Sequence, residues 1–437
     1  MRILYLLYNH RDSLTEFGNN PKINLSWVDA LFEEILKCDN ITIGLVVPVS
    51  DHTVQKSQKN DITFYGLPDP AEKGTLKKAY KRFTRAAVNL RINSYIPEVV
   101  EDFKPDIIHV FGSENPFGLI ATQIKIPVVI HLQGYLFILK RKWFAGISKW
   151  EQFIYASLKD LLLMRGCYND SFTFNAKAET SALIIKNCRY FMGRTRFDKG
   201  IVSLVSPGSS YFHCEEFIRN EFFEKKWDLP LKNEITCFSI LKGGSYKGID
   251  LLVEAFLLVK KYSDISIKLQ ICGVSEDEEI VRIIKKKYRK VIKTVDIEFL
   301  GKLNPDDLVD RLCNSNFYIH PSYLENSPNS ICEAMALGMP VIATKVGGVS
   351  SLINDDVEGI MVQEGEPYAL AGAILDLINN YEKARELGRN ARVKAFKRHY
   401  PKDILENLLS IYDAIITDNR NKEVSRNTGD LSFSSLK

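Results

Sequence analysis

The sequence predicts an α/β protein made of two doubly wound halves, each built around a parallel sheet. Short apolar runs of strand length alternate with helical patterns along the chain, which is typical of parallel sheets covered by helices. With 437 residues, 45% of them hydrophobic and 26% charged, the chain is long enough for two domains of about 200 residues each. A polar stretch that contains a proline, Lys225–Asn233, separates the halves.

The predicted strands are short apolar runs bounded by polar or helical segments. In the first half they cover Ile3–Leu7, Thr42–Val47, Ile107–Phe111, Val128–Leu132, Ser171–Phe174 and Arg189–Met192. In the second half they cover Thr236–Ile240, Lys268–Cys272, Ile297–Leu300, Phe317–His320, Val341–Ala343 and Gly359–Val362. Helical patterns fall at Cys214–Glu224, Ile249–Lys260 and Asp403–Ile416.

These elements predict a Rossmann-like N-terminal domain over residues 1–225 and a Rossmann-like C-terminal domain over residues 233–402. A further helix over residues 403–418 has no strand after it, and residues 419–437 are polar, rich in Ser and Asn, and predicted to be disordered. Ligands of doubly wound sheets lie beyond the carboxyl ends of the strands, so the functional site is expected there.

Composition excludes several classes of protein. The net charge of +4 is small, so no nucleic-acid partner is expected. The eight Cys form no Cys-x-x-Cys pair and have no metal-like spacing with the seven His, which indicates buried thiols in a reducing cytoplasm. The first apolar run stops at Asn9, too early for a signal segment, and no run approaches the ~18 apolar residues of a membrane span. We expect a cytoplasmic protein, with peripheral attachment to the inner face of the cell membrane as an option.

The strongest functional signal is a strand, a turn and a short helix within residues 317–340. Phe317–His320 has the pattern of a buried strand end. Ser327 is expected to cap the following helix, with Pro328 at the first helical position, where a missing amide hydrogen costs nothing. Gly338 is expected to end that helix.

This helix start is a candidate anion site flanked by two carboxylates. The amides of Asn329, Ser330 and Ile331 would lack partners within the helix, and the helix dipole favours a negative charge there. Glu333 shares a face with Asn329 and Ser330, and Glu325 stands just before the turn. Because an ionised carboxylate only accepts hydrogen bonds, sugar and ribose hydroxyls are its natural partners. The alternative is a solvated Glu on an ordinary amphipathic helix.

Glu325 and Glu333, with seven residues between them, stand in "PSYLENSPNSICEAMALGMPVIAT", which resembles the E-x7-E signature of the family-4 retaining glycosyltransferases of the GT-B fold. The chain departs from that pattern at Asn326 and Ser327, where Gly and a large apolar residue are usual. The resemblance implies that Glu333 holds the ribose hydroxyls of a nucleotide-sugar donor. It implies that Glu325 holds the hydroxyls of the donor sugar.

A second signal lies in the glycine-rich loop between Thr236–Ile240 and Ile249–Lys260. Glycines allow a close approach of the backbone to a ligand, and two lysines in such a loop can neutralise a diphosphate. Family members usually carry an Arg and then a Lys in this loop, and Lys242 and Lys247 stand at the matching positions. Gly273 and Gly301 match turns that face the nucleoside in the family, and the resemblance implies main-chain contacts with the base near Gly273 and Lys302.

The first domain matches the family less closely. Gly18 is the only counterpart of a Gly pair that usually follows the first strand, and Gln133 aligns with a donor-binding His. His131, two residues earlier on the same strand face, is the other candidate, with a satisfied core residue as the alternative. Arg194 resembles the Arg of a Gly-Arg-Thr-x-x-Asp segment in surface-polysaccharide members, which implies an acceptor or phosphate contact. A salt bridge from Arg194 to Asp198 is the alternative.

The resemblance implies a retaining transferase of hexosyl or N-acetylhexosaminyl type, with a UDP-sugar as first choice of donor and GDP-mannose as second. The acceptor is expected to be a glycan or polyprenyl-linked glycan of capsule, O-antigen or exopolysaccharide synthesis. No cofactor and no metal are expected, since Lys242, Lys247 and the helix start can stabilise the leaving diphosphate and no Asp-x-Asp motif is present. A nucleotide-sugar 2-epimerase and a non-catalytic GT-B scaffold that binds a partner or lipid are the alternatives.

A basic stretch adds a candidate membrane contact. Lys73–Arg91 holds seven Lys and Arg and no acid, beside an apolar stripe at heptad spacing, and Lys140–Trp143 mixes bases with an aromatic residue. Each base near an anionic membrane adds ~1 kcal/mol, so these segments fit a lipid-facing surface. A core-facing amphipathic helix with a solvated basic side is the alternative.

Overall fold

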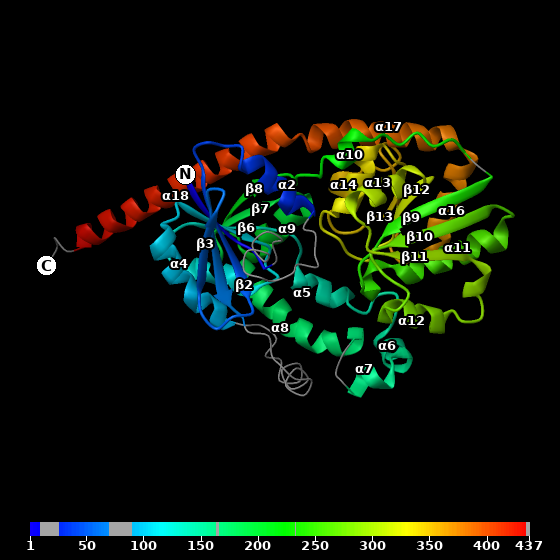
Figure 1. Cartoon of the computed structure of the whole chain (residues 1–437), viewed down its shortest axis with the longest axis horizontal. Coiled ribbons are helices and arrows are strands. Elements are labelled where there is room, and N and C mark those ends of the chain that lie inside the picture. Colours follow the sequence, from blue (N-terminus) through cyan, green and yellow to red (C-terminus); the bar gives the residue numbers. More distant parts are fainter. Residues whose placement is uncertain (9–25, 70–89, 163–165, 232, 434–437) are drawn as a thin grey trace.

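The computed structural model describes residues 1–8, 26–69, 90–162, 166–231 and 233–433. Two α/β lobes lie side by side, and a long helical rod runs along the top of both (Figure 1). Each lobe is centred on one mainly or wholly parallel sheet, which confirms the predicted architecture of two Rossmann-like domains.

The first lobe contains an eight-stranded sheet in the order β3-β4-β2-β1-β5-β6-β7-β8, in which only the β3–β4 pair is antiparallel. Its strands are β1 (Arg2–Leu6), β2 (Thr42–Val49), β3 (Gln55–Lys59), β4 (Ile62–Pro68), β5 (Ile107–Phe111), β6 (Val128–His131), β7 (Tyr190–Gly193) and β8 (Ser210–His213). Its helices are α2 (Ser26–Ile35), η1 (Leu90–Tyr95), α4 (Ile96–Phe103), η2 (Pro116–Thr122), α5 (Leu136–Leu139), η3 (Lys140–Lys142), α6 (Lys149–Tyr155), α7 (Leu158–Leu162), α8 (Gly166–Asn187) and α9 (Arg196–Val205).

The second lobe contains a six-stranded parallel sheet in the order β11-β10-β9-β12-β13-β14. Its strands are β9 (Glu234–Ile240), β10 (Ser266–Cys272), β11 (Asp296–Gly301), β12 (Phe317–His320), β13 (Val341–Thr344) and β14 (Ile360–Val362). Its helices are α10 (Glu221–Glu224), η4 (Ser245–Lys247), α11 (Ile249–Tyr262), α12 (Glu279–Lys287), η5 (Ile292–Thr294), α13 (Pro305–Cys313), α14 (Asn329–Leu337), α15 (Val349–Leu352), α16 (Pro367–Asn379) and α17 (Tyr381–Arg398). The last helix of the chain is α18 (Pro401–Phe433).

Most predicted strands coincide with observed ones; the predicted strand Ser171–Phe174 is wrong. That segment lies inside helix α8, where Phe172 stacks edge-on against Tyr168 one helical turn earlier and Phe174 packs against Trp143. The two aromatic residues of this short run therefore pack against different partners from within a helix. Strands β3, β4 and β8 were not predicted.

The predicted helix Cys214–Glu224 is largely an extended crossing between the domains, and only Glu221–Glu224 is helical. Its apolar side chains change partners along the way: Cys214 and Phe217 lie in the first-domain core, whereas Ile218 and Phe222 lie in the second. The chain thus enters the second core before the predicted boundary stretch at 225–233.

The chain returns to the first domain through α18, on which Ile404, Leu408, Ile411, Tyr412 and Ile415 are buried in the first-domain core. Tyr412 Oη lies 3.2 Å from Tyr5 Oη and 2.5 Å from His109 Nδ1. The helix continues past residue 418 into the stretch predicted to be disordered. An i,i+4 ion pair between Asp418 and Lys422 and a hydrogen bond from Tyr190 to Asp418 hold it there.

Some sequence-based predictions fall on residues whose placement the structure does not describe. Gly18 and residues 73–89 of the basic stretch Lys73–Arg91 lie outside the described residues. Within the described ranges, no helix combines the length and apolar character that a bilayer crossing requires. All eight Cys are free thiols, and Cys188, Cys214, Cys237, Cys272 and Cys332 are buried.

Candidate active site

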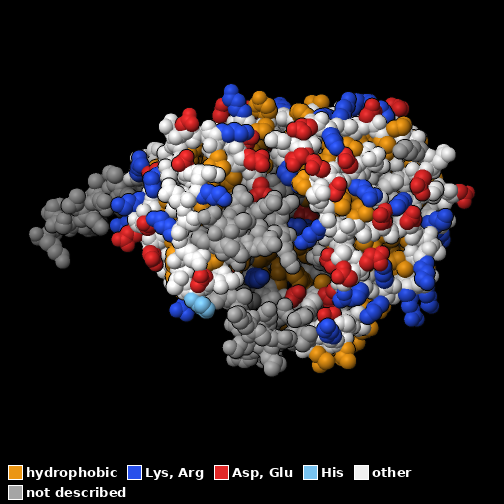
Figure 2. Space-filling view, viewed as in Figure 1, with side chains coloured by type: hydrophobic (Ala, Val, Ile, Leu, Met, Phe, Trp, Pro, Cys, Tyr) orange, Lys and Arg blue, Asp and Glu red, His pale blue; other side chains and the backbone are white. Residues whose placement is uncertain are grey.

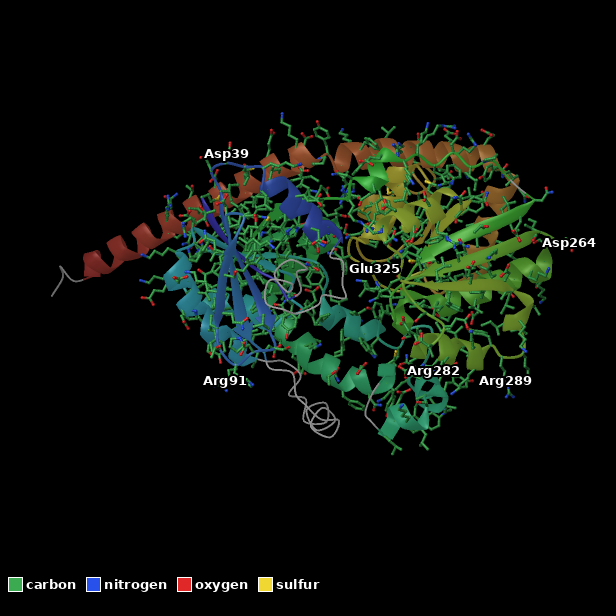
Figure 3. All side chains as sticks on the ribbon, in the orientation of Figure 1. Asp39, Arg91, Asp264, Arg282, Arg289 and Glu325 are labelled. Carbon is green, nitrogen blue, oxygen red and sulfur yellow. The ribbon has the colours of Figure 1, made fainter. Side chains whose placement is uncertain are left out.

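The predicted strand, turn and helix meet the first domain at the centre of the molecule, where Figure 3 places Glu325 between the two lobes. Helix α14 begins at Asn329 and has Pro328 as its N-cap; Gly338 ends it with a φ of 82°. Ser327 does not cap the helix, contrary to the prediction, because α14 starts one residue later than expected; the Ser327 hydroxyl donates to Glu216 Oε1 at 2.7 Å. The amide of Ile331 donates to Pro328 O, so the helix start presents fewer amides than predicted.

Glu325 forms the densest set of charged contacts in this turn. Lys247 Nζ donates to Glu325 Oε1 at 2.5 Å, Ser322 Oγ donates to the same oxygen at 2.9 Å, and His320 Nε2 lies 3.3 Å from it. Burial alone would raise the pKa of Glu325, but the Lys247 charge and the His320 contact outweigh it and hold that pKa well below its usual range. Glu325 is therefore an anion near neutral pH.

Two glycines allow the Lys247 loop to lie against its neighbours. Gly248 has a φ of 78°, and a Cβ there would come within 2.1 Å of Pro321 O. Gly273, predicted to face the nucleoside, has a φ of 95°, and a Cβ there would lie 2.1 Å from Leu241 O. Any other residue would push the loops apart, so these glycines bring Lys247 to Glu325.

Lys242 lies at the exposed end of the same loop, and no carboxylate pairs with it in the described part of the chain. Partial desolvation lowers the pKa of Lys242, and the neighbouring charge of Lys247 lowers it further. Lys302 is exposed as well and adds positive charge in the same direction. Three lysines thus lie close enough to interact electrostatically, and one of them, Lys247, pairs with Glu325 in the turn before α14.

Glu333 faces this site from α14 and is almost completely buried. Burial raises its pKa, and Arg219 counteracts part of that rise by donating from Nη2 to Glu333 Oε1 at 2.8 Å. Arg219 comes from the interdomain crossing and was not predicted. It occupies one carboxylate oxygen and leaves Oε2 of Glu333 without a hydrogen bond to another described residue.

The first-domain candidates lie at the carboxyl ends of β6 and β7. Gln133 accepts a hydrogen bond from Asn326 Nδ2 at 3.4 Å through its carbonyl, which joins the domains beside Glu325. His131 is buried among Trp27, His109 and Phe111, with ring centroids 5.0 to 6.2 Å away. Burial lowers the pKa of His131 well below its usual value, so its ring is neutral.

Arg194 is buried and turned toward the domain crossing. Its guanidinium donates to Leu132 O at 3.1 Å and pairs with Glu216 Oε2 at 3.5 Å, and it lies over the Trp27 ring. Asp198, the predicted alternative partner, instead accepts from the backbone amides of Arg194 and Thr195. In this conformation Arg194 links the first domain to the crossing.

Glu216 is the centre of a buried interdomain cluster. Besides Arg194 and Ser327 it contacts Cys332, whose thiol lies 3.2 Å from Oε1, and His399, whose Nδ1 lies 2.9 Å from the Glu216 carbonyl oxygen. Glu216, Cys332 and His399 have the residue types and proximity of a metal-ligand set. Burial raises the pKa of Cys332 far above its usual value, and Arg194 already balances the carboxylate, so this donor set fits a metal ion poorly.

An arm of the first domain, residues 143–152, reaches the Lys247 loop. Ser245 Oγ donates to Trp143 O at 2.5 Å, and the fully buried Gln152 donates from Nε2 to Ser245 Oγ at 3.0 Å and to Ile147 O at 3.0 Å. Ile147 belongs to the second-domain core. The arm therefore fixes the backbone from which Lys242 and Lys247 project.

Sequence reasoning also missed Glu114, which follows β5 at the carboxyl edge of the first sheet. It is partly buried, and burial raises its pKa to about 7 despite hydrogen bonds from the backbone. Its Oε1 lies 3.3 Å from where a Cβ of Gly134 would stand, so the small residue after β6 leaves it room. A carboxylate three residues after the end of a buried strand was the signal that could have identified it.

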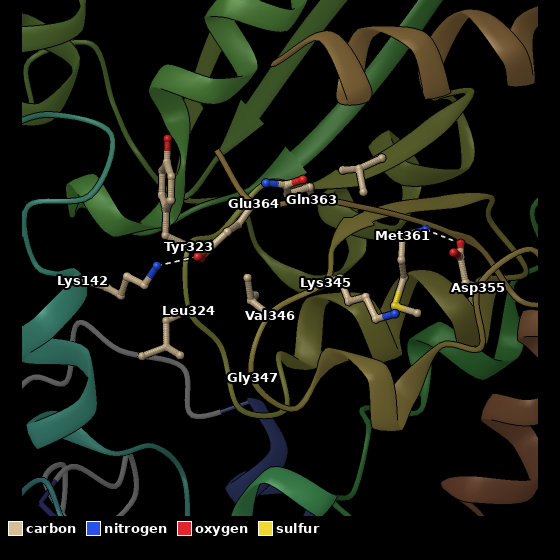
Figure 4. Close-up of a pocket in the computed structure, with 11 residues that line it drawn as sticks. Lys142, Tyr323, Leu324, Lys345, Val346, Gly347, Asp355, Met361, Gln363 and Glu364 are labelled. Carbon is tan, nitrogen blue, oxygen red and sulfur yellow. Dashed lines mark hydrogen bonds and ion pairs between the residues drawn. The ribbon is translucent and has the colours of Figure 1, made fainter. Parts of the chain in front are cut away.

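A cavity of about 600 Å³ opens between the domains beside the turn that carries Glu325 (Figure 4). Lys142 of the first domain pairs with Glu364 of the second at 2.5 Å across it. Apolar side chains share the lining with charged ones, including Tyr323, Leu324, Lys345 and Met361. The cavity thus offers both apolar and charged surface next to Glu325.

Comparison with known proteins agrees with this geometry. Residues 220–394 match the family model described as glycosyl transferases group 1. N-acetyl-alpha-D-glucosaminyl L-malate synthase of Bacillus anthracis is 26% identical over 232 residues, 51% of this chain and 58% of that protein. Capsular polysaccharide biosynthesis glycosyltransferase CapM of Staphylococcus aureus is 26% identical over 225 residues, 51% of this chain and 57% of that protein. The chain spans less than two thirds of the length of these relatives.

Solved structures resemble the chain over almost its whole length. Sucrose-phosphate synthase from Thermosynechococcus elongatus superposes with a TM-score of 0.66 at 15% identity, covering 96% of this chain and all 100% of that one. Anabaena HepE in complex with UDP-glucose superposes with a TM-score of 0.63 at 14% identity, covering 95% and 100%. The fold is therefore that of the GT-B glycosyltransferases. The match of residues 220–394 to the glycosyl transferases group 1 family confirms the resemblance stated from the E-x7-E motif.

Proposed function

We propose that the chain is a retaining glycosyltransferase that moves a sugar from a nucleotide-sugar donor to a glycan or polyprenyl-linked glycan of cell-surface polysaccharide synthesis. The observation that carries the proposal is the Lys247–Glu325 pair beside the start of α14. A diphosphate and a sugar are adjacent in such a donor. A cation and an anion held 2.5 Å apart are complementary to those two groups.

In the proposed reaction, the bond between the anomeric carbon and the diphosphate breaks while positive charge develops on the sugar. Lys242 and Lys247, with the amides at the start of α14, stabilise the leaving diphosphate. Glu325 accepts from hydroxyls of the donor sugar and Glu333 from the ribose through its oxygen that Arg219 leaves open. Gly273 and Lys302 border the base.

A UDP-sugar is the proposed donor, with GDP-mannose second. Solved structures of the same fold include Anabaena HepE in complex with UDP and with UDP-glucose. A hexosyl or N-acetylhexosaminyl group is proposed for transfer. Poly(ribitol-phosphate) alpha-N-acetylglucosaminyltransferase of Staphylococcus aureus, 30% identical over 172 residues, supports the second of these.

The acceptor is proposed to enter the cavity beside Glu325, because both domains line it and it combines apolar and charged surface. The capsular relative supports a surface polysaccharide as its class. A cytoplasmic location and a membrane contact through Lys73–Arg91 stay predictions, and residues 73–89 of that segment lie outside the described residues.

No cofactor or metal is proposed for the transfer, because the lysines beside α14 supply positive charge where the diphosphate would leave. We expect full transfer activity in excess chelator. Strict dependence on a divalent cation would contradict this part of the proposal.

Donor binding and transfer can be tested together with Lys247→Ala. Loss of charge-assisted hydrogen bonds of about 1.5–3 kcal/mol should weaken nucleoside diphosphate binding by roughly 10- to 150-fold and reduce transfer. Unchanged affinity in calorimetry and unchanged transfer of a radiolabelled sugar would refute the diphosphate assignment. Product analysis with a lipid extract separates the alternatives, since a 2-epimerase would change the donor without moving label, and a scaffold would do neither.

A further inference from the structure

The helical tip formed by α6 and α7, residues 149–162, carries a concentration of exposed apolar side chains. Trp150 is 68% exposed, Leu158 74% and Leu162 73%, and Phe153 and Ile154 are also exposed. Figure 2 shows apolar side chains gathered at the lower edge of the molecule, where Figure 1 draws α7. Elsewhere in the described chain, large exposed apolar residues are mostly scattered along different elements. Scattered residues need no explanation, but a gathered set indicates an interaction surface.

The tip is anchored, so its apolar side chains are not displaced core residues. A capping box starts α6, with Glu151 N donating to Ser148 Oγ and Ser148 N donating to Glu151 Oε2. Gln152 on the opposite side of α6 is fully buried against the Ser245 loop. Lys286 of α12 donates to Tyr155 O at 2.8 Å, at the end of α6. The same helix thus has one side fixed to the second domain and another that presents Trp150 and Ile154 to solvent.

The uncompensated charges around the tip are positive. Both of its acids are paired: Glu151 Oε1 lies 3.3 Å from Lys287 Nζ, and Asp160 Oδ2 lies 3.2 Å from Arg282 Nη2. Lys149 and Lys159 are exposed, and neither forms a salt bridge with a carboxylate of the described residues. An apolar patch with spare bases is complementary to a surface that is apolar below and anionic at its head groups.

The shape of the tip favours a bilayer over a protein groove. Its apolar residues stand on short helices that project from the molecule, whereas peptide-binding surfaces are grooves that receive a partner's side chains (Figure 1). Trp is the residue type that suits the boundary between lipid and water, because its ring is apolar and its N–H is polar. We propose that the α6–α7 tip is a membrane-docking surface that inserts Trp150, Leu158 and Leu162 into the interface of an anionic bilayer.

The test is flotation of the full chain with phosphatidylcholine vesicles that contain or lack phosphatidylglycerol, without any nucleotide sugar. A failure of membrane docking would therefore not refute the transfer activity, and a failure of transfer would not refute membrane docking. The wild-type chain should float with the anionic vesicles, and less so as salt screens Lys149 and Lys159. The double variant Leu158→Glu/Leu162→Glu should reduce the bound fraction by about 10-fold or more. Leu204→Glu, on α9 and 81% exposed in the wild type, is the matched control and should float normally.

Trp150 provides a second readout that reports the tip itself. Trp27 and Trp227 are buried and Trp143 is partly buried, so the fluorescence change on adding anionic vesicles should come from Trp150. We expect a blue shift, and its loss in Trp150→Phe. Circular dichroism would confirm that each variant is folded.

Three results would overturn the proposal. The first is no flotation of the wild-type chain, or flotation that the double variant leaves unchanged. The second is equal flotation with neutral and anionic vesicles. The third is concentration-dependent dimerisation that the double variant abolishes, without vesicle binding, which would identify a second copy of the chain as the occupant.

Discussion

Replacing Glu325 by Gln keeps the size of the side chain and removes the charge that holds Lys247. In this variant the charge of Lys247 is no longer balanced by the carboxylate of Glu325, so it attracts an added anion more strongly. We therefore expect Glu325→Gln to tighten binding of a free nucleoside diphosphate while it reduces sugar transfer. The two effects have opposite signs because the proposed role of Glu325 is to bind the sugar and not the diphosphate.

The size of the effect follows from the geometry of the pair. A phosphate oxygen that accepts from Lys247 Nζ opposite Glu325 would lie roughly 5 Å from the carboxylate, since ordinary charge-assisted bonds to the lysine are about 2.8 Å long. Two unit charges 5 Å apart repel by about 1 kcal/mol in water and about 3 kcal/mol at the effective dielectric constant near a protein surface. Removal of that repulsion should tighten binding by roughly 5- to 150-fold.

Isothermal titration calorimetry with UDP measures the binding, and label transfer to a lipid extract measures the reaction. Glu358→Gln is the matched control, because Glu358 is also buried and paired with a lysine, Lys394 at 3.1 Å, but does not contact the donor turn. The control should leave UDP affinity and transfer unchanged. Weaker UDP binding in Glu325→Gln would show that the carboxylate supports the diphosphate site, and the proposed division of roles would be wrong.

Three further predictions concern other side chains. Glu333→Gln should weaken UDP binding because the ribose loses a charged acceptor, and calorimetry showing no change would remove Glu333 from the donor site. Gln152→Leu should cost two hydrogen bonds of about 0.5–1.5 kcal/mol each and raise the donor KM more than it lowers kcat, since Gln152 acts through the Ser245 loop. Glu114 has a pKa raised from 4.5 to about 7, so its protonated form is favoured in the folded state, and stability should fall as pH rises from about 4.5 to 7. Glu114→Gln should lack that loss in urea titrations across this pH range, and a parallel pH dependence would contradict the assignment.

Sequence reasoning identified the β12–α14 stretch because its information is local. The stretch from Phe317 to Gly338 contains a strand, a turn, a helix start and a helix end in direct succession. Their spacing alone predicts which side chains share a face. The same holds for Lys247, because the glycine-rich loop that carries it lies between a strand and a helix and a glycine there allows a close approach of two loops.

The partners of these residues depend on contacts between distant parts of the chain. Arg219 reaches Glu333, and Glu216 reaches Ser327, only because the crossing segment passes behind α14. Neither has a motif, and the helical pattern around them conceals an extended segment. The cap prediction for Ser327 was wrong by one residue, because α14 starts at Asn329 with Pro328 as its N-cap, and the Ser327 hydroxyl donates to Glu216 of the crossing segment.

Helix α18 also determines the order in which the polypeptide can mature during synthesis. One face of the sheet that begins at β1 is covered only in part, by α2, until Leu408, Tyr412 and Ile415 have left the ribosome, because these residues complete its core. The second domain has its whole sheet and most of its helices available earlier, so it can fold while the first is still unfinished. Truncation near residue 400 should accordingly leave an aggregation-prone first domain beside a folded second one, and a tag at the carboxyl end should be better tolerated than a deletion there.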